Sequence, residues 1–103
     1  GCLESAAREL EEETGWRAER LDNLGEYYSS PGLVSESFTL VRASGLTQVG
    51  AGGGVDNENI VPHRVALDQL PDFIAAKRAE GCGIDVKLLI LLAPYLMPGT
   101  ITA

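Results

Sequence analysis

The sequence is poor in cysteine and in positive charge, and each shortage excludes a class of protein. Cys2 and Cys82 stand eighty positions apart in no paired motif, which argues against a zinc site and for free thiols in a reducing cytosol. Eight lysines and arginines face fifteen acids, a net charge of −7, so the clustered positive charge that holds a nucleic-acid backbone is missing. We expect a cytoplasmic protein that binds no nucleic-acid polymer.

Long apolar runs are also missing. The longest, residues 88–97, is too short to span a bilayer and contains Pro94, and no cationic segment precedes an apolar run as in a signal peptide. A chain of 103 residues that is 45% apolar is the size of one small domain with a modest core. We therefore expect a single domain, residues 1–103, that does not bind a membrane.

Acidic residues, by contrast, are concentrated near the start of the chain. Apolar positions in residues 3–14 recur at three- and four-residue intervals, a spacing that predicts an amphipathic helix, and Gly15 is placed to end it in a left-handed conformation. At about 100° per residue, one arc of this helix carries three acids, while Glu11 projects to the far side. The three are Glu9, Glu12 and Glu13.

Crowded carboxylates in the last turn oppose the helix dipole by roughly 0.3–1 kcal/mol per group. A hard divalent cation such as Mg²⁺, which prefers oxygen ligands, would turn this repulsion into a binding site. The alternative is a solvated acidic face on which Arg8 and Glu12 pair four residues apart. Charge pattern alone leaves both interpretations open.

Residues 8–16 have the order Arg-Glu-apolar-any-Glu-Glu-any-Gly-apolar without a gap. This order resembles the second half of the Nudix box, the signature of hydrolases that act on nucleoside diphosphates linked to another group. Counting back from Arg8 places the Glu of the first half one position before Gly1, and the strands that precede the box in Nudix domains are absent. The resemblance implies the C-terminal part of an α+β domain, a Nudix-type α/β/α sandwich with a mixed sheet that lacks its N-terminal strands.

Two later segments resemble the ADP-ribose and GDP-mannose pyrophosphatase branch of that family. Residues 26–32, followed by Glu36, are similar to its tyrosine-rich Ser-Pro-Gly segment, and residues 52–60 are similar to its mobile acidic loop. The resemblance implies Mg²⁺-dependent hydrolysis of the pyrophosphate bond in an ADP-ribose-like nucleoside diphosphate sugar, giving a nucleoside monophosphate and a sugar phosphate. The alternative is a non-catalytic remnant of the fold that serves as a binding or assembly module.

The resemblance also implies a role for each residue of the acidic helix. Glu9 and Glu13 would be the principal ligands of Mg²⁺, or of Mn²⁺ in its place, with Glu12 as the third carboxylate. Arg8 would orient these glutamates. Two or three ions held in this way neutralise a pyrophosphate and lower the pKa of a bound water.

Outside the helix, the resemblance assigns one catalytic base and two substrate contacts. Glu58 would accept the proton of the attacking water, although Asp56 lies close enough to compete for this role. Glu36 and Tyr28 would bind substrate. A solvated acid and a core tyrosine are the ordinary interpretations of these two residues.

The remaining pattern predicts strands, a loop and two more helices. Missing strands would leave unpaired sheet edges, so we expect a homodimer. The expected elements are a strand over 18–29 bent at Gly25, a turn at 30–32, a strand over 36–43, a flexible loop over 44–59, an edge strand over 60–67, a helix with Asp68 as N-cap that ends before Gly81, and a buried helix over 84–96.

Overall fold

The computed structural model describes residues 1–55 and 59–96. It divides after Pro62 into two units, and each is described by itself. The elements are α1 (Cys2–Thr14), β1 (Trp16–Tyr28), β2 (Ser37–Gln48), α2 (Leu70–Ala79) and α3 (Leu89–Leu96), with short 3₁₀ turns before α2 and α3. The expected α+β class is confirmed, whereas the expectation of a single domain stays a prediction.

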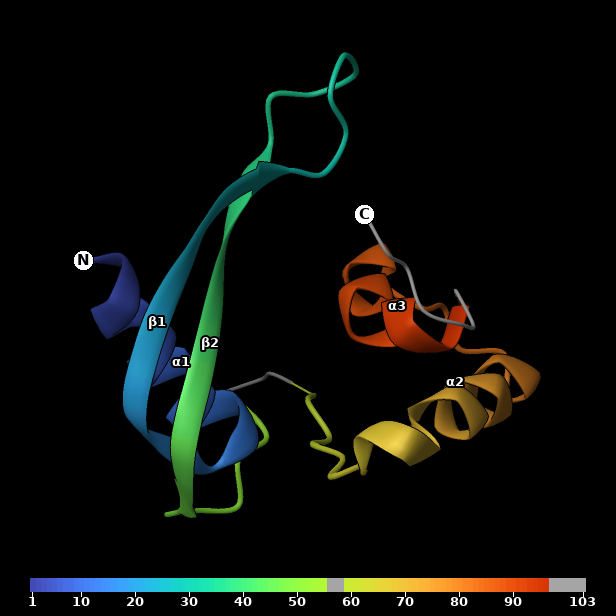
Figure 1. The fold of residues 1–103 in the computed structure, drawn as a ribbon. Helices are drawn as coiled ribbons and strands as arrows, with labels where there is room; N and C mark the ends of the chain where they lie inside the picture. Colours follow the sequence, from blue (N-terminus) through green and yellow to red (C-terminus); the bar gives the residue numbers. More distant parts are fainter. Residues whose placement is uncertain (56–58, 97–103) are drawn as a thin grey trace. The chain divides into compact units, whose positions relative to one another are not determined.

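The first unit consists of α1 and an antiparallel hairpin. β1 and β2 pair from Trp16 opposite Gln48 to Tyr28 opposite Ser37. α1 packs mainly on β1 and lies along one face of the hairpin, over the half away from its turn (Figure 1). The helix and the two strands therefore form a small two-layer structure.

α1 follows the sequence prediction closely. It covers residues 2–14 and ends at Gly15, which has a φ of 80° and donates its N–H to the Glu11 carbonyl at 2.9 Å. The side chains along its apolar stripe are half-buried against the hairpin: Ala6, Ala7, Leu10 and Thr14. Amphipathic spacing and a left-handed cap are local signals, so the sequence alone was enough to predict this helix and its end.

The bend expected in the first strand is also present. The register of β1 shifts between Asn23 and Gly25, where Gly25 has a φ of 111°. The Asn23 side-chain oxygen accepts a hydrogen bond from the Gly25 N–H at 2.8 Å. A positive φ of this kind is open to glycine at little cost, so the irregularity falls where the sequence permits it.

Two predictions between residues 44 and 67 are wrong. β2 continues to Gln48, so residues 44–48 belong to the strand instead of a loop, because Ser44 and residues 46–48 pair with residues in the first part of β1. Residues 59–66 form no strand. Pro62 has no N–H to donate to a ladder, and in the described part of the chain β1 and β2 pair only with each other.

The second unit is built around α2 and α3. Its buried core comprises Leu70, Ile74 and Leu92, against which Val65, Phe73, Ile84 and Leu88 pack. This cluster is small, and each of the two helices contributes one face to it.

The starts and the burial of these helices differ from the predictions, whereas α2 ends at Ala79, before Gly81, and α3 ends at Leu96, as predicted. Asp68 is not the N-cap of α2: it lies within a 3₁₀ turn (Leu67–Gln69), and the helix begins at Leu70, after Gln69. Residues 84–96 are helical only from Val86, first as a 3₁₀ turn and then as α3. α3 is not buried all round, because Leu92 packs inward while Leu89, Ile90 and Leu91 are 42–50% exposed.

None of the helices in the described residues has the length and apolar content needed to cross a membrane. Cys2 and Cys82 are both exposed free thiols.

Candidate functional site

The candidate metal ligands lie along α1. Glu9 is exposed, whereas Glu12 and Glu13, in the last turn, are half-buried. Within residues 1–55 and 59–96, no side-chain hydrogen bond or ion pair engages Arg8 or any of these three acids. The Arg8–Glu12 pair of the solvated-face interpretation is therefore not formed, and no neighbouring cation of the described residues neutralises the three carboxylates.

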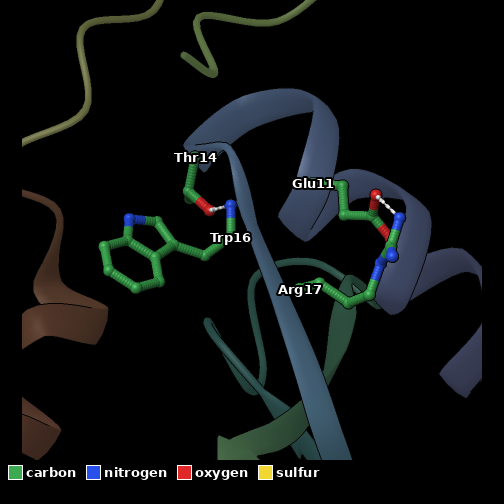
Figure 2. Close-up of polar contacts among 4 residues, drawn as sticks. All are labelled: Glu11, Thr14, Trp16 and Arg17. Carbon is green, nitrogen blue, oxygen red and sulfur yellow. Dashed lines mark hydrogen bonds and ion pairs between the residues drawn. The ribbon is translucent and has the colours of Figure 1, made fainter. Parts of the chain in front are cut away.

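Glu11, on the same helix, is neutralised by Arg17 on β1. The Arg17 Nε lies 3.2 Å from Glu11 Oε2, and its Nη2 lies 3.1 Å from Oε1, so the contact is two-pronged (Figure 2). These hydrogen bonds, together with the charge of the guanidinium, lower the pKa of the Glu11 carboxyl below its usual value. Glu11 thus ties α1 to β1, whereas the other three acids have no such partner among the residues that the structure describes.

A threonine joins the end of the helix to the start of the strand. The Thr14 hydroxyl donates to the Leu10 carbonyl at 2.5 Å. It also accepts from the Trp16 N–H at 3.2 Å (Figure 2). One side chain therefore closes the last turn of α1 and sets the path of the chain into β1. The Nudix-like motif of residues 8–16 is one continuous structural piece.

The segment after β2 returns to the same helix end. We refer to residues 50–54, four of which are glycine, as the glycine segment. The Gly53 N–H donates to the Glu13 carbonyl, and the Gly54 N–H donates to the Glu12 carbonyl, both at 2.8 Å. The last carbonyls of a helix have no partner within it, so the glycine segment satisfies two of them.

Two further hydrogen bonds, from residues that precede Gly53 in the chain, also hold the glycine segment in place. The Gly15 carbonyl accepts hydrogen bonds from the N–H groups of Val49 at 2.8 Å and Gly50 at 3.1 Å. The prediction of a flexible loop over 44–59 missed this docking. In the sequence, the only indication of this docking was the density of glycine, because glycine allows two backbones to approach closely.

The structure does not bring the two candidate substrate residues to the acidic helix. Tyr28 ends β1 and Glu36 immediately precedes β2, so both lie at the turn end of the hairpin. Glu13 lies at the opposite end, beside Trp16. A strand of 13 residues at about 3.3 Å per residue separates the two ends by roughly 40 Å.

Glu58, predicted as the catalytic base, and its rival Asp56 lie outside the described residues.

The oxygen donors on α1 can be compared with the ligands that a divalent cation requires. Carboxylate oxygens are the ligands that Mg²⁺ prefers. Glu12 and Glu13 are half-buried, and no cationic side chain in the described part of the chain pairs with them. Across residues 1–55 and 59–96, however, no three His, Cys, Asp or Glu side chains gather closely enough to hold a metal ion as they stand. The donor chemistry fits Mg²⁺, and the side chains would have to turn toward one point to bind it.

Comparison with known proteins gives two relatives. The chain is 36% identical over 75 residues to a methanol dehydrogenase activator of Bacillus methanolicus, a match that covers 72% of this chain and 40% of that protein. It is 33% identical over 87 residues to a GDP-mannose pyrophosphatase of Enterobacter sp. (strain 638), covering 82% of this chain and 44% of that protein. The chain is thus weakly homologous to both and spans less than half the length of either.

No family model matches the chain. No solved structure matches it significantly.

Proposed function

We propose that this chain belongs to a Nudix hydrolase that cleaves the pyrophosphate bond of a nucleoside diphosphate sugar such as ADP-ribose. The observation that carries the proposal is the uninterrupted motif of residues 8–16, which lies on α1, its left-handed cap Gly15 and the start of β1. The 33% identity to a GDP-mannose pyrophosphatase supports the same substrate class. The products would be a nucleoside monophosphate and a sugar phosphate.

The proposed metal ligands are Glu9 and Glu13, with Glu12 as the third carboxylate and Arg8 as the residue that orients them. Bound there, Mg²⁺ or Mn²⁺ would supply charge neutralisation for the pyrophosphate and a water of lowered pKa. Two features of the protein support this assignment. Among residues 1–55 and 59–96 the three carboxylates have no competing ion pair, and the backbone of Glu12 and Glu13 is held by the glycine segment.

The other proposed roles rest on the family resemblance alone. Glu58 would accept the proton of the attacking water, with Asp56 as the rival base. The substrate contacts of Glu36 and Tyr28 gain no support from the hairpin, which places both residues at its far end. All four assignments remain predictions.

The proposal is tested by incubating the chain with ADP-ribose or GDP-mannose and separating the products by ion-exchange chromatography. With Mg²⁺ present, we expect a nucleoside monophosphate and a sugar phosphate in equal amounts, and addition of a chelator should stop their formation. A nucleoside monophosphate offered as substrate is the control, because it contains no pyrophosphate bond. No product from either nucleotide sugar would contradict the enzymatic proposal for this chain.

The second candidate function is a non-catalytic module for binding or assembly. The 36% identity to a methanol dehydrogenase activator favours it, as does the absence of a preformed group of three metal ligands among residues 1–55 and 59–96. Magnesium calorimetry combined with the hydrolysis assay separates the two functions. Binding of Mg²⁺ together with turnover identifies the enzyme, whereas the module would show no turnover.

We further propose that the chain associates as a homodimer. In the described part of the chain, β1 and β2 pair only with each other, so each has an open edge of the kind that pairs with another chain. Light scattering at micromolar concentration should give twice the 10.9 kDa of one chain. A charge at Leu46, 49% exposed on β2, should disfavour edge pairing.

The matched pair of variants is Leu46→Lys and Leu33→Lys. Leu33 is 87% exposed in the turn between the strands, so its change adds the same charge away from the strand edges. We expect only Leu46→Lys to shift the mass toward the monomer. A monomeric wild-type chain would contradict the proposed association.

A further inference from the structure

We propose that Gly52 is a positioning residue for divalent-cation binding. It allows the glycine segment to lock the last turn of α1, the turn that carries Glu12 and Glu13. The inference rests on the proposed function, because it takes those carboxylates as metal ligands. It adds that their affinity for the cation depends on a segment nearly forty positions further along the chain.

The lock consists of backbone hydrogen bonds to two consecutive residues. The carbonyls of Glu12 and Glu13 each accept an N–H from the glycine segment at 2.8 Å. Helix ends fray because their terminal carbonyls lack partners inside the helix. With both carbonyls bonded, the peptide groups on which the two carboxylates stand are held in one conformation. A cation that needs both side chains at once then meets ligands whose backbone is already ordered.

Gly52 makes this approach possible because it has no side chain. A Cβ at this position would lie 2.5 Å from the Thr14 carbonyl carbon and 2.7 Å from the Glu13 carbonyl oxygen. These are backbone atoms of the helix end, so they cannot swing aside as the tip of a flexible side chain would. An alanine here would force the glycine segment away from α1.

Gly32 provides a close control for the backbone conformation of Gly52. The φ of Gly52 is 71° and that of Gly32 is 86°, so alanine bears left-handed strain at either position. A Cβ at Gly32 would meet nothing within 4 Å. Any effect found in Gly52→Ala and not in Gly32→Ala therefore comes from the lost contact with α1.

If the segment assists cation binding, the cation must also stabilise the segment, because coupling between two sites is reciprocal. The two N–H groups that donate to α1, those of Gly53 and Gly54, report on this directly. Their hydrogen exchange, followed residue by residue by NMR, should slow when Mg²⁺ is added. A purely structural role of the glycines would leave these exchange rates independent of Mg²⁺.

The experiment combines Mg²⁺ calorimetry with this exchange measurement on the wild-type chain and three variants. For Gly52→Ala, we expect the Mg²⁺ dissociation constant to rise about tenfold and the Gly53 and Gly54 amides to exchange faster. Gly32→Ala should match the wild type in both measurements. Glu13→Gln should lose Mg²⁺ binding while keeping the wild-type exchange rates found without metal.

Several outcomes would overturn the inference. Equal Mg²⁺ affinity in Gly52→Ala and the wild type would do so while leaving the proposed function standing. Should Gly52→Ala fail to fold, the wild type alone decides: Mg²⁺ binding that leaves the Gly53 and Gly54 exchange rates unchanged rejects the coupling. If neither the wild type nor Glu13→Gln binds Mg²⁺, the assignment of the metal ligands fails, and the inference fails with it.

Discussion

Replacing Glu13 with glutamine is expected to lower the Mg²⁺-dependent hydrolysis of ADP-ribose by about a hundredfold or more, as the loss of a metal ligand should. Glutamine keeps the size of the side chain and its carbonyl oxygen but removes the negative charge that attracts the cation. Glu13 is half-buried and has no side-chain partner among the described residues. The measurement is kcat/KM over a range of Mg²⁺ concentrations, with circular dichroism to show that the fold is kept.

Glu11→Gln is the matched control for this prediction. It makes the same chemical change on the same helix, two positions away, at a carboxylate that bonds Arg17 and is not one of the proposed metal ligands. We expect it to keep wild-type turnover and Mg²⁺ dependence. Unchanged turnover in Glu13→Gln, or an equal loss in both variants, would refute the assignment of the metal ligands.

Replacing Gly15 with alanine is expected to destabilise the first unit by about 3 kcal/mol. Gly15 has a φ of 80°, and a left-handed conformation costs a residue with a Cβ roughly 1–2 kcal/mol. The added Cβ would also collide with the Gly50 carbonyl oxygen and lie 2.8 Å from the Gly52 N. The change therefore strains the cap of α1 and displaces the glycine segment together.

Urea denaturation followed by tryptophan fluorescence measures this effect well, because the only tryptophan, Trp16, is the next residue. Gly32→Ala is again the control, since it adds left-handed strain with nothing within 4 Å of the new Cβ. We expect it to cost only the strain, about 1–2 kcal/mol. Equal losses in the two variants would mean that the contact between Gly15 and the glycine segment contributes nothing to stability.

Features with a local cause could be predicted from the sequence. The helix of residues 2–14 follows from the spacing of its apolar residues, and its end follows from Gly15. The bend at Gly25 and the turn at residues 30–32 depend on glycine and proline in the same short segments. In each case the residues that decide the conformation lie within a few positions of it.

Features that depend on a distant partner were predicted poorly. β2 continues to Gln48 because β1 supplies partners there, while residues 59–66 form no strand although their composition suits one. The sequence also predicted α3 to be buried, whereas one side of it is exposed. An apolar helix can pack on one side or on all sides, and the surrounding elements decide which.

The acidic helix shows the same division at the candidate site. The sequence alone determined that Glu9, Glu12 and Glu13 occupy one helix and that Gly15 ends it, because helical periodicity and the conformational freedom of glycine act over one or two turns. Only the tertiary structure decided that Arg17 binds Glu11 and that the glycine segment bonds the carbonyls of Glu12 and Glu13. The glycine segment reaches α1 only after the chain has passed through both strands, and Arg17 reaches Glu11 only because the start of β1 folds back against the helix. Helical periodicity predicts neither contact, because each depends on how a later element packs on α1.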